Sequence, residues 1–364
     1  MRISVVVPTL GRPSLYPLLD RVPAGPDREV LVVDDRPDRT EPLPVPSGVR
    51  VVPGRARGPA AARNTGWRAA RHEWIAFLDD DVLPDPDWPA RLADDLAAAG
   101  DEVGGVQGVL RVPLAVGRRP TDWERVTAGL ADGAWITADM AYRAAALARA
   151  GGFDERLPRA FREDAELAFR VRRQGWSLRR GQRTTVHPVR PESPWVSVRT
   201  QRGNADDALL RRLHGPRWRE LLEIPPGRRG KHAAVTAAGL AAVTLAIAGR
   251  RPLAGVLAAA WAAGTAEFAA ARISPGPRDR REVATMLATS AVIPPIAVAH
   301  WLRGWWRWRD ARPMAPAPVP DSAADSAADS GPGRPAVTRP GGKLGADAVT
   351  RPAPPVTPPI RAGR

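Results

Sequence analysis

Four short apolar runs, each followed by polar residues, constrain the fold of this chain more than any other feature. The runs are rich in β-branched residues and cover residues 3–7, 30–33, 49–52 and 74–78. Their length is typical of strands, and residues 59–71, which carry Ala and Arg at helical spacing, separate the last two runs. This alternation predicts an α/β fold, a mostly parallel sheet with helices on its faces.

Polar groups stand at the ends of three of these predicted strands, namely Thr9, Asp34-Asp35 and Asp79–Asp81. Ligands of parallel sheets bind beyond the carboxyl ends of the strands. We therefore expect these groups to form one binding edge. Further strands are expected at residues 106–110 and 134–137, and a helix over 164–174 that Gly175 closes.

The net charge of +15 rests almost wholly on Arg, since only Lys231 and Lys343 are lysines. A Walker-type phosphate loop is excluded, because no Lys precedes residue 231. A basic balance favours anionic lipid or phosphorylated substrates as partners, and nucleic acid is the weakest of the options. The chain has no Cys, so any metal ion must be held by Asp, Glu or His.

Three apolar, Ala-rich stretches cover residues 233–249, 253–271 and 283–302. A membrane-spanning helix needs about 20 apolar residues. The first stretch is short, the second contains Glu267, and the third ends in Trp mixed with Arg, which is typical of a membrane interface. We favour two spans, with one stretch in the interface or re-entrant. The alternative is a buried Ala-rich helical hairpin of a soluble domain.

The apolar run at the N-terminus, residues 3–7, is too short for a secretory signal, so we expect a membrane-associated protein with a cytoplasmic catalytic domain. The predicted organisation is a domain over residues 1–225, a membrane-associated helical segment over 226–312, and a disordered Pro/Ala-rich tail over 313–364. The domain divides into a nucleotide-binding half, 1–110, and an acceptor half, 111–225.

Two acidic elements are candidates for chemistry. The run Asp79–Asp81 follows a buried strand, and three adjacent carboxylates repel one another unless a cation binds them. Oxygen ligands of this kind select Mg²⁺ or Mn²⁺. Glu163-Asp164 stands at the start of a helix, whose dipole stabilises an anion able to accept a proton from a hydroxyl group. For both elements, simple helix capping is the alternative.

Two further residues are less specific. Arg63 lies early in a predicted helix, where an Arg can hold a phosphate or a base edge, although a solvent-facing Arg is commoner. His187 precedes Pro188, and a lone His is more often structural than a ligand.

Seven segments, taken together, resemble the family 2 glycosyltransferases. The segments stand in the family's order and approximate spacing over roughly residues 1–190. They are residues 5–9 (VVVPT), 31–35 (LVVDD), 58–66 (GPAAARNTG), 77–81 (FLDDD), 138–143 (ADMAYR), 151–154 (GGFD) and 162–164 (RED). The resemblance implies a GT-A fold, a nucleotide-sugar donor, a divalent metal ion and inversion at the anomeric carbon.

The resemblance also assigns roles to individual residues. Pro8, Thr9, Asp34 or Asp35, and Arg63 would hold the nucleotide, and Asp80 would face the ribose or diphosphate. Asp81 would hold the metal, with Asp79 in support and His187 as a further metal or phosphate contact. Asp164 would be the general base and Glu163 its neighbour. Two departures from the family pattern, Arg36-Pro37 after the Asp pair and Asp139 beside Trp135, bear on base contact and acceptor recognition.

The predicted function is transfer of a sugar from a nucleotide-diphosphate sugar to a hydroxyl acceptor, a lipid-linked or cell-envelope glycan. One rival is a sugar nucleotidyltransferase, which would need a basic Gly-rich loop after the first strand, whereas residues 8–12 hold one Gly and one Arg. The other is a non-catalytic, membrane-associated nucleotide-sugar-binding protein, against which Asp81 and Asp164 argue.

Overall fold

The computed structural model describes residues 1–314, so the tail predicted over residues 313–364 lies almost wholly outside the described residues. The strands are β1 (Ile3–Thr9), β2 (Arg28–Asp34), β3 (Val49–Pro53), β4 (Trp74–Leu78), β5 (Leu83–Pro84), β6 (Val103–Arg111), β7 (Asp139–Arg143) and β8 (Ser177–Val186). The helices of the sheet-bearing part are α1 (Leu15–Arg21), α2 (Pro59–Ala69), α3 (Trp88–Ala97), α4 (Asp122–Ala128), α5 (Ala144–Ala150), α6 (Glu163–Arg173), α7 (Val196–Arg199), the 3₁₀ turn η1 (Thr200–Gly203), α8 (Asn204–His214) and α9 (Trp218–Leu221). The remaining helices are α10 (Arg229–Ile247), α11 (Arg251–Ile273) and α12 (Arg280–Arg307).

The first half of the sheet is parallel, as the sequence predicts. All strands form one sheet in the order β3-β2-β1-β4-β7-β6-β8-β5. Strand β1 pairs in parallel with β2 and β4, and β2 pairs in parallel with β3. In this register Thr9 lies beside Asp34, so the polar ends of neighbouring strands share one edge.

The second half of the sheet is mixed. Strand β7 runs antiparallel to both β4 and β6, whereas β6 and β8 are parallel. The strand predicted at residues 134–137 is wrong, because Trp135 has φ +64°, which an extended strand does not allow. The strand begins instead at Asp139, and the other predicted strands and helices fall where the structure has them to within a few residues.

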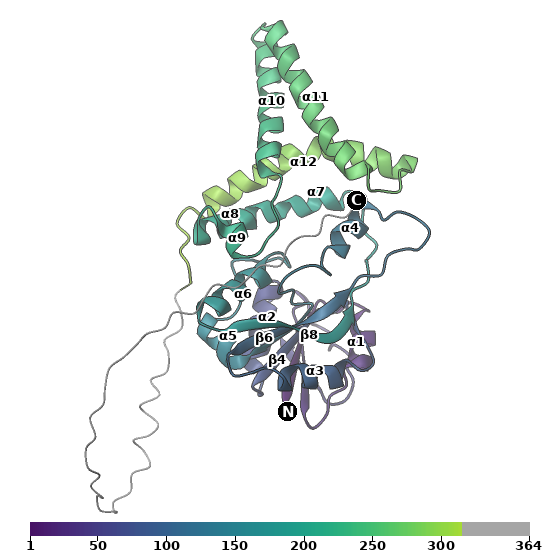
Figure 1. Ribbon diagram of the computed structural model, residues 1–364, viewed down its shortest axis with the longest axis vertical. Helices are drawn as coiled ribbons and strands as arrows, with labels where there is room; N and C mark the ends of the chain where they lie inside the picture. Colours follow the sequence, from purple (N-terminus) through teal and green to yellow (C-terminus); the bar gives the residue numbers. More distant parts are fainter. Residues whose placement is uncertain (315–364) are drawn as a thin grey trace, which may run out of the picture. The chain divides into compact units, whose positions relative to one another are not determined.

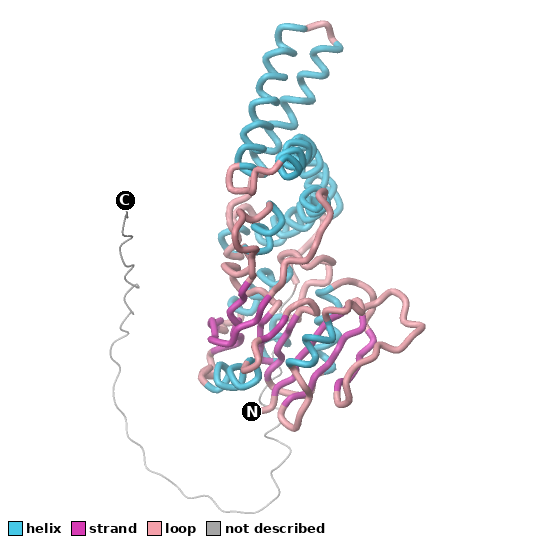
Figure 2. The backbone as a smooth tube through the Cα atoms, turned by 90° about the vertical axis from the view of Figure 1, so that its right-hand side faces the viewer, coloured by secondary structure: helices cyan, strands magenta, loops and turns pink. Residues whose placement is uncertain are grey.

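Alternate side chains of the central strands pack on opposite faces of the sheet, as the pleat requires. Val5 and Val7 join a core that includes residues of α1 and α3, and Val6 joins the core beneath α2, α5 and α6. Helix α2 lies very close to β1: a Cβ atom on Gly66 would lie 2.3 Å from Val6 Cγ1. Figure 2 shows the strands side by side with helices on both faces.

Helices α10 and α11 run side by side as a hairpin (Figures 1 and 2). Both are long and apolar enough to cross a membrane, and of their most apolar windows 0% and 11% are buried. The alternative of a buried hairpin is therefore wrong. Glu267 on α11 pairs with Arg228 and Lys231 at the start of α10, so its charge lies at the root of the hairpin, near the sheet-bearing part.

Helix α12 is the third helix long and apolar enough to cross a membrane, but a third of its most apolar window is buried against the protein. Near its start, Glu282 Oε1 accepts a hydrogen bond from the Asp122 amide (2.9 Å). Near its end, it crosses α8 so closely that a Cβ atom on Gly304 would lie 2.5 Å from the Ala205 backbone. Both ends of α12 thus contact the sheet-bearing part of the chain.

Candidate functional site

The acidic run after β4 begins at the binding edge of the sheet. All five residues of β4 are buried, so the chain leaves the core directly into Asp79–Asp81. Asp80 accepts hydrogen bonds from Thr9 Oγ1 at the end of β1 (2.7 Å) and from the Arg12 guanidinium (2.9 Å). The neighbouring ends of β1 and β4 therefore meet, as the sequence predicts, and Arg12 joins them.

Asp81 is buried, with 8% of its surface exposed. Arg190 Nε lies 2.9 Å from Asp81 Oδ2, and His187 Nε2 lies 4.0 Å from Asp81 Oδ1. Burial, and then repulsion by Asp79, raises the pKa of Asp81, although His187 and Arg190 oppose the rise. Asp81 and His187 are 106 residues apart in the sequence. They come together because the end of β8 pairs with β5, which follows the acidic run.

Arg63 joins the two acidic elements. Its guanidinium donates to Asp79 Oδ1 (2.6 Å) and to Glu163 Oε1 (2.7 Å), and it lies 5.5 Å from the centre of the Phe153 ring. Only 1% of Arg63 is exposed. The predicted contact of Arg63 with a nucleotide is thus replaced in this structure by contacts with two carboxylates, because α2 packs tightly on the sheet and leaves the side chain no path to solvent.

Glu163 and Asp164 form the first turn of α6. The residue before them, Arg162, has φ +73°, and its side chain does not cap the helix. Asp164 Oδ1 accepts a hydrogen bond from the Ala165 amide in this first turn (2.7 Å), so the capping alternative stays open for Asp164. Burial, followed by the adjacent Asp164 charge, raises the pKa of Glu163 to about 7. Burial also raises the pKa of Asp164, although the Ala165 amide and Arg63 oppose it. Here desolvation outweighs the hydrogen bonds and the positive charge of Arg63, which favour the anions.

Asp34 and Asp35 have separate surroundings. Arg36 donates two hydrogen bonds to the Asp34 carboxylate, from its Nε and from a terminal nitrogen (both 2.8 Å). These bonds hold the pKa of Asp34 below its usual range. Asp35 accepts hydrogen bonds from the backbone amides of Arg55, Ala56 and Gly58 and so orders the loop before α2. Asp34 lies at the strand edge beside Thr9, whereas Asp35 supports a loop. Pro8 also lies on β1, beside Val33.

The two candidate acceptor residues differ in access. Asp139 is fully buried and accepts hydrogen bonds from Trp88 Nε1 (2.7 Å), Arg183 Nε (2.7 Å) and Thr185 Oγ1 (2.6 Å). These contacts connect α3, β7 and β8. Because both carboxylate oxygens of Asp139 already accept hydrogen bonds, neither is free to contact an acceptor substrate. Trp135 is partly exposed, and its indole N–H donates to Glu223 (3.2 Å).

Two residues of this site were missed in the sequence. Arg12 holds Asp80, and Arg190 holds Asp81. The only available signal was their position, since each is an Arg shortly after a strand of the binding edge, and in so Arg-rich a chain this position alone does not single them out.

The expected metal site is not assembled as a trio. Within residues 1–314 no three His, Asp or Glu side chains gather closely enough to hold a metal ion. Asp79 accepts a hydrogen bond from Arg63. Of the three predicted metal ligands, only Asp81 and His187 lie near each other. Mg²⁺ is usually held by one or two carboxylates together with substrate phosphates. A buried Asp81 with a raised pKa, facing a binding edge, fits such a partial ligand set.

Comparison with known proteins gives the following likenesses. Residues 4–128 match the model of glycosyl transferase family 2. The succinoglycan biosynthesis protein ExoO of Rhizobium meliloti is 40% identical over 80 residues, which are 21% of this chain and 23% of that protein. The pre-mycofactocin glycosyltransferase of Mycobacterium tuberculosis is 31% identical over 138 residues, 34% of this chain and 28% of that protein. The chain thus spans about a quarter of the length of these curated relatives.

Among solved structures, glucosyl-3-phosphoglycerate synthase from Mycobacterium tuberculosis, in complex with Mn²⁺, UDP-glucose and phosphoglyceric acid, is 19% identical. The match covers 62% of this chain and 81% of that chain, with a TM-score of 0.41.

Proposed function

Because residues 4–128 match the model of glycosyl transferase family 2, we propose that this protein transfers a sugar from a nucleotide-diphosphate sugar to a hydroxyl group of a lipid-linked or cell-envelope glycan. One observation carries the proposal: a single buried guanidinium, that of Arg63, holds Asp79 and Glu163 together. The acidic run suited to a donor diphosphate and the acidic pair suited to a base are thereby neighbours in one site, although they are far apart in sequence.

In the proposed mechanism the donor lies along the edge formed by β1, β2 and β4. Pro8, Thr9 and Asp34 line the nucleotide side of this edge, and Asp80 faces the ribose or diphosphate. Asp81, with His187, would hold a Mg²⁺ or Mn²⁺ ion, which when bound neutralises charge on the departing diphosphate. Arg190, now paired with Asp81, is near enough to contact the same diphosphate.

Asp164 would act as the general base. The acceptor oxygen forms a bond to the anomeric carbon as the bond from that carbon to the diphosphate breaks, and the acceptor proton passes to the Asp164 carboxylate. Direct attack of this kind inverts the anomeric configuration. A raised pKa makes Asp164 a stronger base than an exposed Asp, which suits proton transfer near neutral pH.

We also propose that only α10 and α11 cross the membrane and that the sheet-bearing domain, residues 1–225, is cytoplasmic. Helix α12 contacts the domain near both of its ends, through Glu282 and through Gly304. A helix that crossed the bilayer could keep only one end at the domain. Its Trp-rich end, with Trp301, Trp305 and Trp306, suits the interface.

The rival functions are less well supported. A nucleotidyltransferase needs basic groups free for a triphosphate, whereas Arg12 is engaged with Asp80. The raised pKa values of Glu163 and Asp164 are typical of a catalytic site and are not expected of a protein that only binds a nucleotide-sugar.

The test is Asp164→Asn in the full-length protein. We expect kcat to fall on the order of 10³-fold, the range typical of a lost general base, with donor binding unchanged. Thermal stabilisation by UDP-, GDP- and dTDP-sugars with Mn²⁺ identifies the donor and measures its binding. Glu220→Gln, an exposed carboxylate of the same half, is the control. Full activity of Asp164→Asn would refute the assignment of the base.

A further inference from the structure

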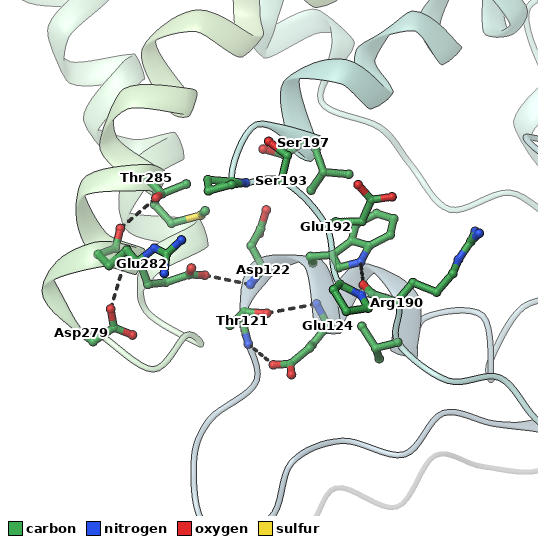
Figure 3. Close-up of a pocket in the computed structure, with 17 residues that line it drawn as sticks. Thr121, Asp122, Glu124, Arg190, Glu192, Ser193, Ser197, Asp279, Glu282 and Thr285 are labelled. Atoms are coloured by element: carbon green, nitrogen blue, oxygen red, sulfur yellow. Dashed lines mark hydrogen bonds between the residues drawn. The ribbon is translucent and has the colours of Figure 1, made fainter. Parts of the chain in front are cut away.

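A cavity of about 440 Å³ lies between the sheet-bearing domain and the start of the apolar helix α12 (Figure 3). Its walls are the start of α4, the loop 189–197 that follows β8, and the first two turns of α12. None of the residues predicted from the sequence to form the site lines it. The position is notable because one wall belongs to a helix long and apolar enough for a membrane.

The walls of this cavity are fixed to one another by buried polar contacts. Arg272, at the end of α11, is 8% exposed. Its guanidinium donates to Asp122 Oδ2 (2.7 Å) on α4, to Ser197 Oγ (2.9 Å) after the loop, and to Thr289 Oγ1 (2.7 Å) on α12. One side chain thus ties all three walls together, so the cavity is pre-formed, as ligand sites usually are.

The cavity is also connected to the candidate active site. The Trp123 indole N–H donates to the backbone carbonyl of Arg190 (3.0 Å). The Arg190 side chain leaves that loop and contacts Asp81 (2.9 Å). A single loop residue, Arg190, therefore connects the cavity to Asp81, the proposed metal ligand.

The lining has a distinctive chemistry. Its charged side chains are five carboxylates and two guanidinium groups, namely Asp122, Glu124, Glu192, Asp279 and Glu282 with Arg190 and Arg281. The Arg190 guanidinium is already engaged with Asp81. Asp122, Glu124 and Glu192 are each paired with a guanidinium group from outside the lining, at 2.7, 2.6 and 2.5 Å, so their charges are balanced. The lining therefore offers no excess of positive charge that would select a phosphate. A carboxylate has about four lone-pair sites, so these groups can accept further hydrogen bonds from hydroxyl groups.

Apolar surface completes the lining, from Trp123, Met286 and the two prolines of the loop. A flat aromatic ring suits the C–H face of a sugar ring, while carboxylates suit its hydroxyl groups. We propose that this cavity binds the uncharged, hydroxyl-bearing glycan of a membrane-anchored acceptor. The inference rests on the proposed function and deepens it, because it assigns the acceptor as a glycan hydroxyl and not a lipid phosphate.

The decisive experiment fills the cavity from α12. Thr285 lines it, whereas the preceding residue, Ala284, is exposed and does not. Full-length Thr285→Trp and Ala284→Trp are reconstituted in lipid nanodiscs, and binding of decyl glucoside below its micelle concentration is measured by saturation-transfer NMR on the sugar protons. We expect Thr285→Trp to weaken binding at least tenfold and Ala284→Trp to leave it unchanged. Equal binding by the two variants would overturn the proposal.

Two further arms separate the ligand classes. Decyl phosphate is measured in parallel, and we expect it to bind at least tenfold more weakly than decyl glucoside; preference for the phosphate would overturn the proposal. Glu192→Gln removes one lining carboxylate, so binding of the glucoside should weaken, whereas a site for an anion would bind its ligand more tightly. Donor binding is measured in the same samples. If the wild-type protein binds no nucleotide-sugar donor, the proposed function is refuted. The binding of decyl glucoside tests the proposed role of the cavity independently.

Discussion

At the scale of single residues, Arg63 is the side chain on which the proposed site depends. It is the buried cation between the buried Glu163 and the partly exposed Asp79, two carboxylates that would otherwise repel each other. Removing one partner of a buried ion pair typically costs about 3–5 kcal/mol, because the remaining charge is left uncompensated.

We expect Arg63→Met to lower the unfolding temperature strongly and to abolish transfer. Arg68→Met is the matched control, since Arg68 is on the same helix but about half exposed. Thermal unfolding and donor turnover of the two variants, side by side, measure the difference. If both variants unfold at the same temperature, Arg63 does not stabilise the site.

The acidic pair predicts a pH dependence. The pKa of Glu163 is raised to about 7 and that of Asp164 is also raised, so the protonated forms persist to higher pH than usual. Activity should therefore be lost as the pH falls through the neutral range. Asp79→Asn removes a negative charge that raises the pKa of Asp164, so the acid limb of kcat/KM should move down by about one pH unit. Profiles from pH 5 to 9 measure this, and an unmoved limb would argue against Asp164 as the base.

The residues of this site were predictable to different degrees. Thr9, Asp80 and Asp81 follow from strand ends, because sheet geometry brings such ends together. The sequence identified Arg63 as a site residue but not its contacts with two carboxylates. A sequence does not show how tightly a helix packs on the sheet and how little of a side chain stays exposed. Asp139 looked like an acceptor contact, yet its partners on α3 and β8 are set by pairing across the sheet.

At the scale of elements, the start of α6 is strained. Arg162 adopts a left-handed conformation, which costs a non-glycine residue about 1–2 kcal/mol. It also pairs with the buried Asp207 of α8 (3.1 Å). The two carboxylates that follow take their direction from this turn.

The conformation and the ion pair can be separated by two substitutions. Arg162→Gly and Arg162→Ala both remove the pair with Asp207, but only glycine adopts the left-handed conformation at little cost. We expect the glycine variant to keep several-fold more activity than the alanine variant, with donor binding equal in both. The sugar-transfer rates of the two variants are compared. Equal rates would show that the backbone conformation at residue 162 does not position Asp164.

The elements themselves were predictable where local pattern and tertiary structure agree. Strands β1 to β4 carry continuous apolar runs, and their bounds match closely. Strand β8 has Arg or Gln at four of its positions and so gives no apolar signal in the sequence. Several of its side chains face solvent, and a few, such as Arg183, make buried polar contacts.

At the scale of the whole molecule, the question is which helices cross the membrane. Helix α12 is about 42 Å long at 1.5 Å per residue, yet contacts the domain near both ends. The hairpin of α10 and α11 returns to Arg272, which is tied to α4 and α12. The ends of the hairpin and of α12 are thus all expected on the side of the domain.

The chain lacks Cys, so single-cysteine variants report topology without background. Val116→Cys lies on an exposed loop of the domain, Ala248→Cys at the tip of the hairpin, and Asp310→Cys just after α12. An impermeant maleimide should label only the Ala248 variant in intact cells, and the other two in inverted vesicles. If α12 crossed the bilayer, the Asp310 variant would label from the side opposite to the Val116 variant. If the hairpin lay on the surface, all three would label from one side, because no segment between them would then cross the apolar core.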